Sequence, residues 1–358
     1  MNHSGSQNWN WKRNIWVMML PLVVACLSPT MLDIDPTAGG GRVVISGQIS
    51  TLEGRTIAEI GITSPQGARP VPITGAEVYV VGPGGIRMAL YDHPEIPGKY
   101  ECIGCTGVPG QTYHLEVRLT DGRTFRSDDE TMPLENGKDE LSNEMVLEEY
   151  IDFDGALIQE PVIRIYTKPE LASGGYYRWE TEEVYLIRPT DFPDPFGSVP
   201  PDCFVTQAAD PQRVVLFDGR TFTGEFPEPL LVARRTLDIS FFYKHYFTVY
   251  LGSLTEAAYD YWKNVGIVAN QSGSIFDSPP ARVEGNIRSS GTSTAYGYFQ
   301  ASNESLQRFS VQRSDLPKFA FINRWCDYDY TRPYDDYRPD CFDCLSVRNS
   351  SHRRPDWF

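Results

Sequence analysis

Histidine is scarce in this sequence of 358 residues, and the motifs of common hydrolases are lacking. None of the histidines lies in an HExxH metal-binding motif, and no serine lies in a GxSxG nucleophile motif. His114 falls within an alternating strand pattern, so we expect it on a strand face. Two carboxylates brought together by the fold remain an open alternative, because a glycosidase pair need not be close in sequence. We expect no catalytic activity. The five histidines are His3, His93, His114, His245 and His352.

The main apolar run near the N-terminus is too short to cross a membrane. Ile15–Ala25 has about half of the ~20 residues that a spanning helix needs, and Lys12 and Arg13 precede it. This is the pattern of a secretory signal, and Cys26 follows it directly. A small residue before a cysteine is typical of the bacterial lipoprotein signal, in which the cysteine is acylated and becomes residue one. We therefore expect residues 1–25 to be removed and Cys26 to carry acyl chains such as palmitate. An ordinary signal peptide with an incidental cysteine is the alternative.

Positive charge is in deficit. The chain has 32 Lys and Arg against 47 Asp and Glu, a net charge of −15. Phosphate backbones and anionic lipid surfaces would repel such a protein. We therefore expect no nucleic-acid partner, and we expect contact with a membrane through the lipid anchor.

Six cysteines remain after Cys26, an even number that favours disulfides in an exported chain. We expect Cys102 to pair with Cys105 and Cys203 to pair with one of the C-terminal cysteines. The two C-x-x-C pairs leave a zinc site as an alternative, but no histidine lies nearby at ligand spacing, so we expect no metal and no cofactor beyond the lipid. The six are Cys102, Cys105, Cys203, Cys326, Cys341 and Cys344.

The composition predicts a mostly β protein. Aromatic residues make up 13% of the chain, and 30 Gly and 27 Pro favour strands and turns over helices. After a flexible tether at 26–41, short alternating runs separated by turns predict a β-sandwich at 42–148. The order of its elements, from Gly75 to Tyr113, resembles the transthyretin-like or immunoglobulin-like sandwich. We expect a larger β-rich domain with a cysteine-stapled tail at 149–358.

One amphipathic helix is expected in the second domain. Ser253 and Glu256 form a capping box, and an apolar stripe follows from Leu254 to Val268. Within that stripe we expect Tyr261 and Trp262 to hold the helix against a sheet. Elsewhere, Asp152-x-Asp154-Gly155 is similar to the start of a calcium loop, but it lacks the later glutamate, so we expect a turn.

Several segments resemble a Bacteroidota family of predicted outer-membrane lipoproteins, catalogued only as a domain of unknown function. The resemblance rests on Cys26 and on the segments YYRW (176–179), SLTEAAYDYWKNV (253–265), GSIFDSPPARVEGNI (273–287) and YGYFQAS (296–302). It continues to a C-terminal C-x-x-C followed by RPDW (354–357). The tail departs from the family where a glycine-containing turn is usual.

The resemblance implies a location and a kind of partner. Genes of this family often stand beside those of TonB-dependent receptors, so we expect an outer-membrane lipoprotein on the extracellular face that acts as an accessory subunit of such a receptor. Asp33 and Asp35 loosely fit the acidic surface-export signal of these bacteria. The alternative is an adhesin, or a protein that binds a glycan or peptide by itself, with Tyr176, Tyr177 and Tyr243 as aromatic platforms.

Overall fold

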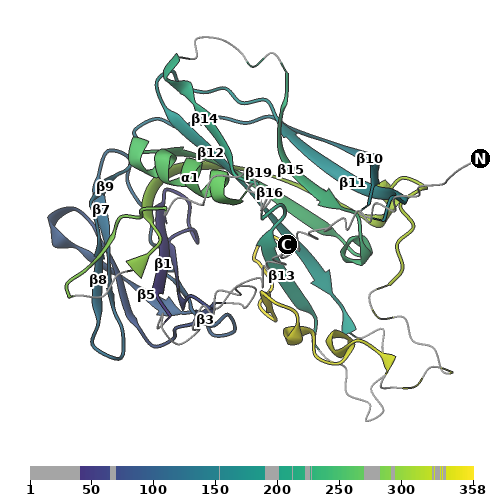
Figure 1. Cartoon of the computed structure of the whole chain (residues 1–358), viewed down its shortest axis with the longest axis horizontal. Helices are drawn as coiled ribbons and strands as arrows, with labels where there is room; N and C mark the ends of the chain where they lie inside the picture. The colour runs from purple at the N-terminus through teal and green to yellow at the C-terminus, as the bar shows by residue number, and fades with distance from the viewer. Residues whose placement is uncertain are drawn as a thin grey trace, which may run out of the picture. The chain divides into compact units, whose positions relative to one another are not determined.

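The computed structural model describes residues 41–64, 70–152, 154–189, 201–211, 213–221, 226, 228–269, 283–291, 295–324, 326, 331, 333 and 336–358. The signal, Cys26 and the tether up to residue 40 lie outside these residues. The described chain is mostly β-strand with one α-helix, which confirms the predicted fold class (Figure 1). No helix in these ranges is long and apolar enough to span a membrane.

The first part of the described chain is a β-sandwich. β1 pairs antiparallel with β2, while β4 lies between β5 and β7, and β7 also pairs with β8. Alternate side chains of each strand point into one core, as Tyr113, Leu115 and Val117 of β7 do. Its strands are β1 (Val43–Ser50), β2 (Ile57–Ile62), β3 (Val71–Pro72), β4 (Glu77–Val81), β5 (Arg87–Asp92), β6 (Lys99–Glu101), β7 (Thr112–Arg118), β8 (Thr124–Ser127) and β9 (Glu130–Thr131).

Three later strands complete this sandwich. β17 (Ile287–Ser289) pairs with β8, and β18 (Ala295–Tyr296) and the start of β19 (Phe299–Val311) run parallel to β1. Ile287, Phe299 and Ala301 are buried in the sandwich core. The sandwich therefore takes strands from both ends of the described chain.

The remaining strands form two sheets around a second core. β11 pairs with β10 and β15 in a three-stranded sheet, and in the other sheet β12 pairs with β13, β14 and β16. β19 pairs with β16 through its second half, so one strand joins both cores. The strands of these two sheets besides β19 are β10 (Leu141–Ile151), β11 (Leu157–Thr167), β12 (Tyr176–Ile187), β13 (Cys203–Ala208), β14 (Val215–Asp218), β15 (Leu230–Thr236), β16 (His245–Leu254) and β20 (Ser350–Ser351).

A long hairpin, β10 and β11, spans the expected domain boundary at residue 148. The Asp152 side chain accepts hydrogen bonds from the backbone N–H groups of Asp154 and Ala156. This is the turn that the sequence predicted, because an Asp side chain stabilises a turn by binding N–H groups that follow it.

The N-cap of helix α1 (Glu256–Ala269) lies two residues later than expected. Ser253 and Leu254 belong to strand β16, and the side chain of Thr255 accepts the N–H of Ala258 at 3.1 Å. Thr255 is therefore the N-cap and Glu256 the first helical residue, so the predicted capping box of Ser253 and Glu256 is wrong. The hydroxyl of Thr255 also donates to Glu130 at 2.7 Å, which ties the cap to the sandwich.

The aromatic residues of α1 hold the helix against a sheet, as the sequence predicted. Nε1 of Trp262 donates to Gln300 at 2.6 Å, and Tyr261 stacks on Tyr298 with ring centroids 4.7 Å apart. Gln300 lies in β19 and Tyr298 directly precedes that strand, so the helix packs where β19 joins the two cores.

Candidate functional site

A buried group of charged side chains lies where strands of both cores meet. Arg55, in the turn between β1 and β2, binds both carboxylate oxygens of Glu304 in β19 at 3.2 and 3.3 Å. It also reaches Glu180 in β12 at 3.3 Å and lies over the Tyr250 ring, 3.8 Å from its centroid. Arg178 contacts the same Glu180 oxygen at 3.4 Å. Two arginines therefore share one carboxylate of β12.

Hydrogen bonds extend this group into a closed ring. The Arg178 guanidinium stacks on Trp262 at 3.6 Å, and Trp262 donates to Gln300. Gln300 donates to Gln48 at 3.3 Å, and Gln48 donates to the carbonyl of Arg55 at 3.0 Å. We call the set the Arg55 network. Its members are Gln48, Arg55, Arg178, Glu180, Tyr250, Trp262, Gln300 and Glu304.

The charges of the network shift the pKa values of its acids and bases. Desolvation opposes the charge on Glu180, but Arg55 and Arg178 outweigh it and lower its pKa to about 2. Desolvation lowers the pKa of Arg178, whose ion pair with Glu180 offsets it only in part. For Arg55 desolvation is the largest effect, yet Glu304 and Glu180 together raise the pKa. Glu180 is therefore ionised at neutral pH.

Within the Arg55 network and its surroundings, Glu180 and Glu182 are the two carboxylates that most resemble the general acid and general base of an enzyme. They project from the same face of β12, and desolvation raises the pKa of Glu182 while that of Glu180 is lowered. Both are engaged within the protein, because Glu180 binds two arginines and Glu182 accepts the Tyr250 hydroxyl at 3.3 Å. These contacts make the Arg55 network a junction between sheets.

A second buried cluster has the residue types of a hydrolase triad. Nδ1 of His245 lies 3.4 Å from Oγ of Ser240, and its Nε2 lies 3.1 Å from Glu183. Ser240 donates its proton to Asp238 at 2.6 Å, and Phe241 stacks on the imidazole at 4.0 Å. Neither Ser240 nor His245 is accessible to a substrate, since both are buried. The cluster therefore stabilises the core.

The three tyrosines expected as ligand platforms do not come together. Tyr177 is buried in the second core and donates to the carbonyl of Ala172 at 2.8 Å. Tyr176 is buried beneath α1 against Tyr259, with ring centroids 4.9 Å apart. Tyr243 lies just before His245, at the far end of β16, about 30 Å along the strand from the residue opposite Tyr176. No shared aromatic site forms from them.

Disulfides pair all six of the expected cysteines. Cys102 joins Cys105, Cys203 joins Cys344, and Cys326 joins Cys341. The structure therefore contains the local bridge and the long-range staple that the sequence predicted.

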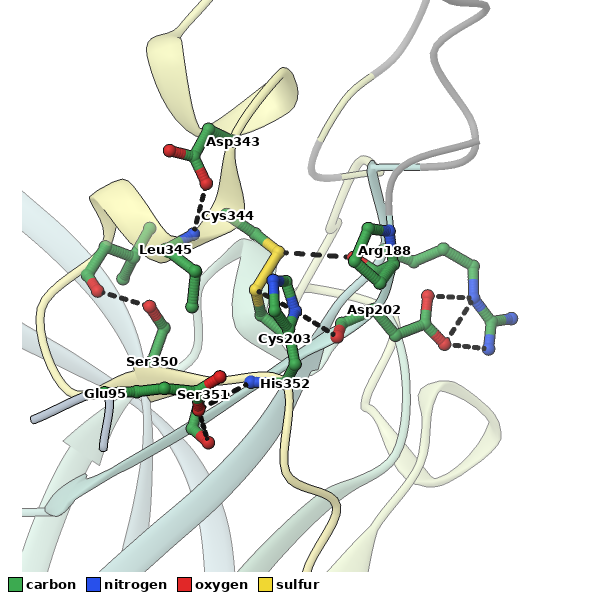
Figure 2. The surroundings of a disulfide bond; sticks show 12 residues. Glu95, Arg188, Asp202, Cys203, Asp343, Cys344, Leu345, Ser350, Ser351 and His352 are labelled. Atoms are coloured by element: carbon green, nitrogen blue, oxygen red, sulfur yellow. Dashed lines mark hydrogen bonds and ion pairs between the residues drawn. A yellow bond between two sulfur atoms is a disulfide. The ribbon is translucent and has the colours of Figure 1, made fainter. Parts of the chain in front are cut away.

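The Cys203–Cys344 staple holds the C-terminal tail on β13 (Figure 2). Both cysteines lie in a small buried cluster separate from the second core. Next to it, Ser350 and Ser351 form β20, which pairs with β13. Ser351 also donates to Glu95 of the sandwich, and the N–H of His352 donates to the same carboxylate at 3.2 Å. The tail thus joins β13 to the sandwich.

His352 gives this staple the residue types of a metal site. Its Nδ1 lies 3.4 Å from the sulfur of Cys203, and the ligand atoms of Cys203, Cys344 and His352 all lie within 4.8 Å of one another. A zinc ligand is a thiolate, and both sulfurs are bonded to each other here. The cluster is therefore a disulfide with an imidazole beside it.

A groove of about 490 Å³ lies on the outer face of the sandwich sheet. Arginines line it, but Arg87 pairs with Glu116 at 2.7 Å, Arg126 with Asp129 at 2.6 Å and Arg288 with Asp128 at 3.0 Å. Most of its positive charge is thus neutralised by neighbours. Its lining residues include Glu77, Tyr79, Arg87, Glu116, Arg118, Arg126 and Arg288.

The Arg55 network was not among the sites predicted from the sequence. One signal was present, because Arg178, Glu180 and Glu182 alternate with buried residues of the strand YYRWETEEVYLI. Charged residues at every second position of an otherwise apolar strand indicate that one face of the strand contacts charged partners, while the other face packs in the hydrophobic core.

The fold and these sites define a disulfide-stapled, mostly β protein with two cores. Its sequence matches the family model described as a domain of unknown function (DUF4249) over residues 29–308, and the chain belongs to this family. No curated protein matches the sequence. The matched range contains the Arg55 network, the His245 cluster and the β10–β11 hairpin, and it ends within β19.

Proposed function

We propose that this protein is a non-catalytic lipoprotein of a Bacteroidota outer membrane, anchored through Cys26 on the extracellular face. It acts there as an accessory subunit of a TonB-dependent nutrient receptor. The observation that carries the proposal is the sequence around Cys26: a charged leader, a short apolar run, a small residue and then the cysteine, followed by a glycine-containing tether. Two or more acyl chains would hold such a chain stably on a membrane.

The described side chains support a role in binding rather than in catalysis. The His245 cluster is buried, and the Glu180 and Glu182 carboxylates are engaged by arginines and a tyrosine. The family resemblance, with its receptor genes alongside, supports the choice of partner.

The anchor is tested by metabolic labelling with an alkyne fatty acid in the native host. Wild-type protein takes up the label and sediments with outer membranes, whereas Cys26→Ala takes up none and is released. Cys105→Ser is a matched control, because it also removes a cysteine and leaves Cys26 in place. Labelling of Cys26→Ala at the wild-type level contradicts the lipid anchor.

The accessory role is tested by a pull-down of tagged protein from outer membranes in mild detergent, followed by mass spectrometry. Stoichiometric recovery of a TonB-dependent receptor is the expected result, and the cargo of that receptor then gives the substrate class. Recovery of the lipoprotein alone overturns the accessory role.

Autonomous ligand binding is the second candidate, and the groove on the sandwich favours it. Tyr79 and Arg118 line this groove, and no ion pair involves Arg118 within the described chain, so a glycan or peptide that brings a carboxylate to Arg118 would fit it best. Glycan and peptide arrays test this candidate, with Arg118→Ala as the variant expected to lose the signal.

A further inference from the structure

Apolar side chains of the β10–β11 hairpin recur beyond the core that it covers. Met145 of β10 and Ile163 of β11 face each other and pack against the second core. Side chains two, four and six residues further out project from the same face of the pleated hairpin. On that face Leu147 lies opposite Pro161, the polar pair Glu149 and Gln159 follows, and Ile151 lies opposite Leu157 next to the turn.

These outer side chains are exposed in the folded protein. Ile151 is 72% exposed, Leu157 is 62% exposed, and Tyr150 beside them is also exposed. Six residues of a strand separate Met145 from Ile151, so this outer apolar pair lies about 20 Å past the last core contact. Apolar side chains gathered on a protruding element mark an interaction surface, whereas scattered ones do not.

The outer edge of β10 is also free within the described chain, where β10 pairs with β11 alone. Its 11 residues contain no proline and no lysine, the residues that usually protect an edge from pairing. The hairpin thus offers a partner both an apolar face and a strand edge.

The acidic residues of the hairpin restrict what can cover it. Of the six acidic residues at 141–167, Glu144, Glu148 and Glu160 form ion pairs with Arg164 or Arg234. Glu149, Asp152 and Asp154, nearest the turn, form no ion pair within the described chain, so this end of the hairpin is negative. A second copy of the protein would bring the same negative end against it, on a molecule of net charge −15. Insertion into a membrane would bury Asp152 and Asp154 at the tip, which is costly, and anionic lipids would repel them.

We propose that the β10–β11 hairpin is the element that docks on the receptor, in an apolar cleft rimmed by Lys and Arg. This inference rests on the proposed accessory function and adds the surface and the chemistry of the contact. Ile151 and Leu157 lie at the centre of the contact, and the carboxylates around them face the basic rim.

The test repeats the outer-membrane pull-down with Ile151→Ser/Leu157→Ser. Both side chains are exposed, so the variant is expected to fold, and circular dichroism and the melting temperature check this. Ile86→Ser/Ile103→Ser is the matched control, because these isoleucines are 66% and 71% exposed on the sandwich. Recovery of the receptor should fall at least about tenfold with the hairpin variant and stay unchanged with the control.

A photo-crosslinking amino acid at position 157, with position 103 as control, identifies what covers the hairpin. An adduct with the receptor from position 157 alone supports the inference, and an adduct with a second copy or with lipid overturns it. Equal receptor recovery by the wild type and the hairpin variant overturns the hairpin assignment and leaves the accessory role intact. Absence of the receptor from the wild-type pull-down overturns both.

Discussion

Nε2 of His245 lies 3.1 Å from a carboxylate oxygen of Glu183, and both side chains are completely buried. The same oxygen accepts Nε of Arg235 at 2.7 Å. Burial raises the pKa of Glu183, but the hydrogen bond and charge of His245 and the charge of Arg235 outweigh it, so the pKa is lowered. Loss of any one partner leaves a buried polar group without its counterpart.

Replacement of Glu183 by Ala should lower the free energy of unfolding by about 3–5 kcal/mol at pH 7, because it removes the buried carboxylate that Arg235 and His245 share. Urea denaturation measures this loss. The exposed Glu149→Ala is the control and should change stability by less than about 0.5 kcal/mol. A similar small change for Glu183→Ala would show that the cluster adds nothing to stability.

In the wild type, acid should remove the stability that the Glu183 carboxylate contributes. A carboxyl whose folded pKa lies below its unfolded value, here near 4.5, stabilises the fold above pH 4.5. The contribution is lost as the pH falls from there through the folded pKa. Urea denaturation at pH 7 and below pH 4.5 should therefore show a difference between the wild type and Glu183→Ala that shrinks in acid. If the difference in stability between the wild type and Glu183→Ala does not change with pH, the ionised Glu183 carboxylate is not its source.

Arg55→Met should destabilise the protein by about 3–5 kcal/mol, since Glu304 and Glu180 lose their shared cation inside the protein. Arg87→Met is a matched control, because Arg87 also lies over a tyrosine ring and pairs with a glutamate, but on the surface. The control should cost less than about 1 kcal/mol. Equal losses in the two variants would contradict a special role for burial.

The Arg55→Met substitution should also change the pH at which Glu180 titrates. The pKa of Glu180 is lowered to about 2 in the wild type, with Arg55 as the largest of the opposing charges. Removal of Arg55 should raise that pKa, so acid unfolding of Arg55→Met should begin at higher pH. Carboxyl carbon NMR across pH 2–6 follows the change, and an unmoved Glu180 titration would disprove the coupling.

The three disulfides should differ in their effect on stability by the length of the loop that each closes. Cys203 and Cys344 are 141 residues apart, Cys326 and Cys341 are 15 apart, and Cys102 and Cys105 are 3 apart. Chain entropy predicts losses of about 5, 3 and 2 kcal/mol for the paired serine variants. Guanidinium denaturation of the variants measures the order, and a larger loss for Cys102→Ser/Cys105→Ser than for the staple would refute it.

Thr255→Ala should destabilise the protein by about 1–2 kcal/mol, because α1 loses its cap and buried Glu130 loses a donor. Thr255→Ser keeps the hydroxyl and should restore most of this free energy. Ser253→Ala tests the cap that the sequence favoured and should cost less than Thr255→Ala in thermal denaturation. The reverse order would restore Ser253 as the cap.

Local patterns in the sequence were enough to predict the strands, the turn at Asp152 and the packing of the aromatic residues of the helix against a sheet. Each depends on neighbours within a few residues, such as Asp152 with Asp154 and Ala156. The helix cap was misplaced because Ser253 and Thr255 are both good caps, and the pairing of β16 with β12 carries the strand through Leu254. Tertiary pairing decided between two residues of similar propensity.

The Arg55 network could not be predicted because its partners are remote in sequence. Arg55 and Glu304 are 249 residues apart, and no local pattern relates them. The outer hairpin face was missed for another reason. An alternating apolar pattern indicates that a strand face is buried, and it does not reveal that the core ends at Met145 while apolar residues recur on the same face at Leu147 and Ile151.

The shared strand β19 sets the order in which the protein can fold during synthesis. Phe299 and Ala301 fill the core of a sandwich whose first strand begins at Val43. A growing chain emerges from the N-terminus, so the first strand waits for more than 250 residues before its parallel neighbour is made. Until then the edge of this strand and its core side chains lack these partners, and an unpaired edge favours aggregation.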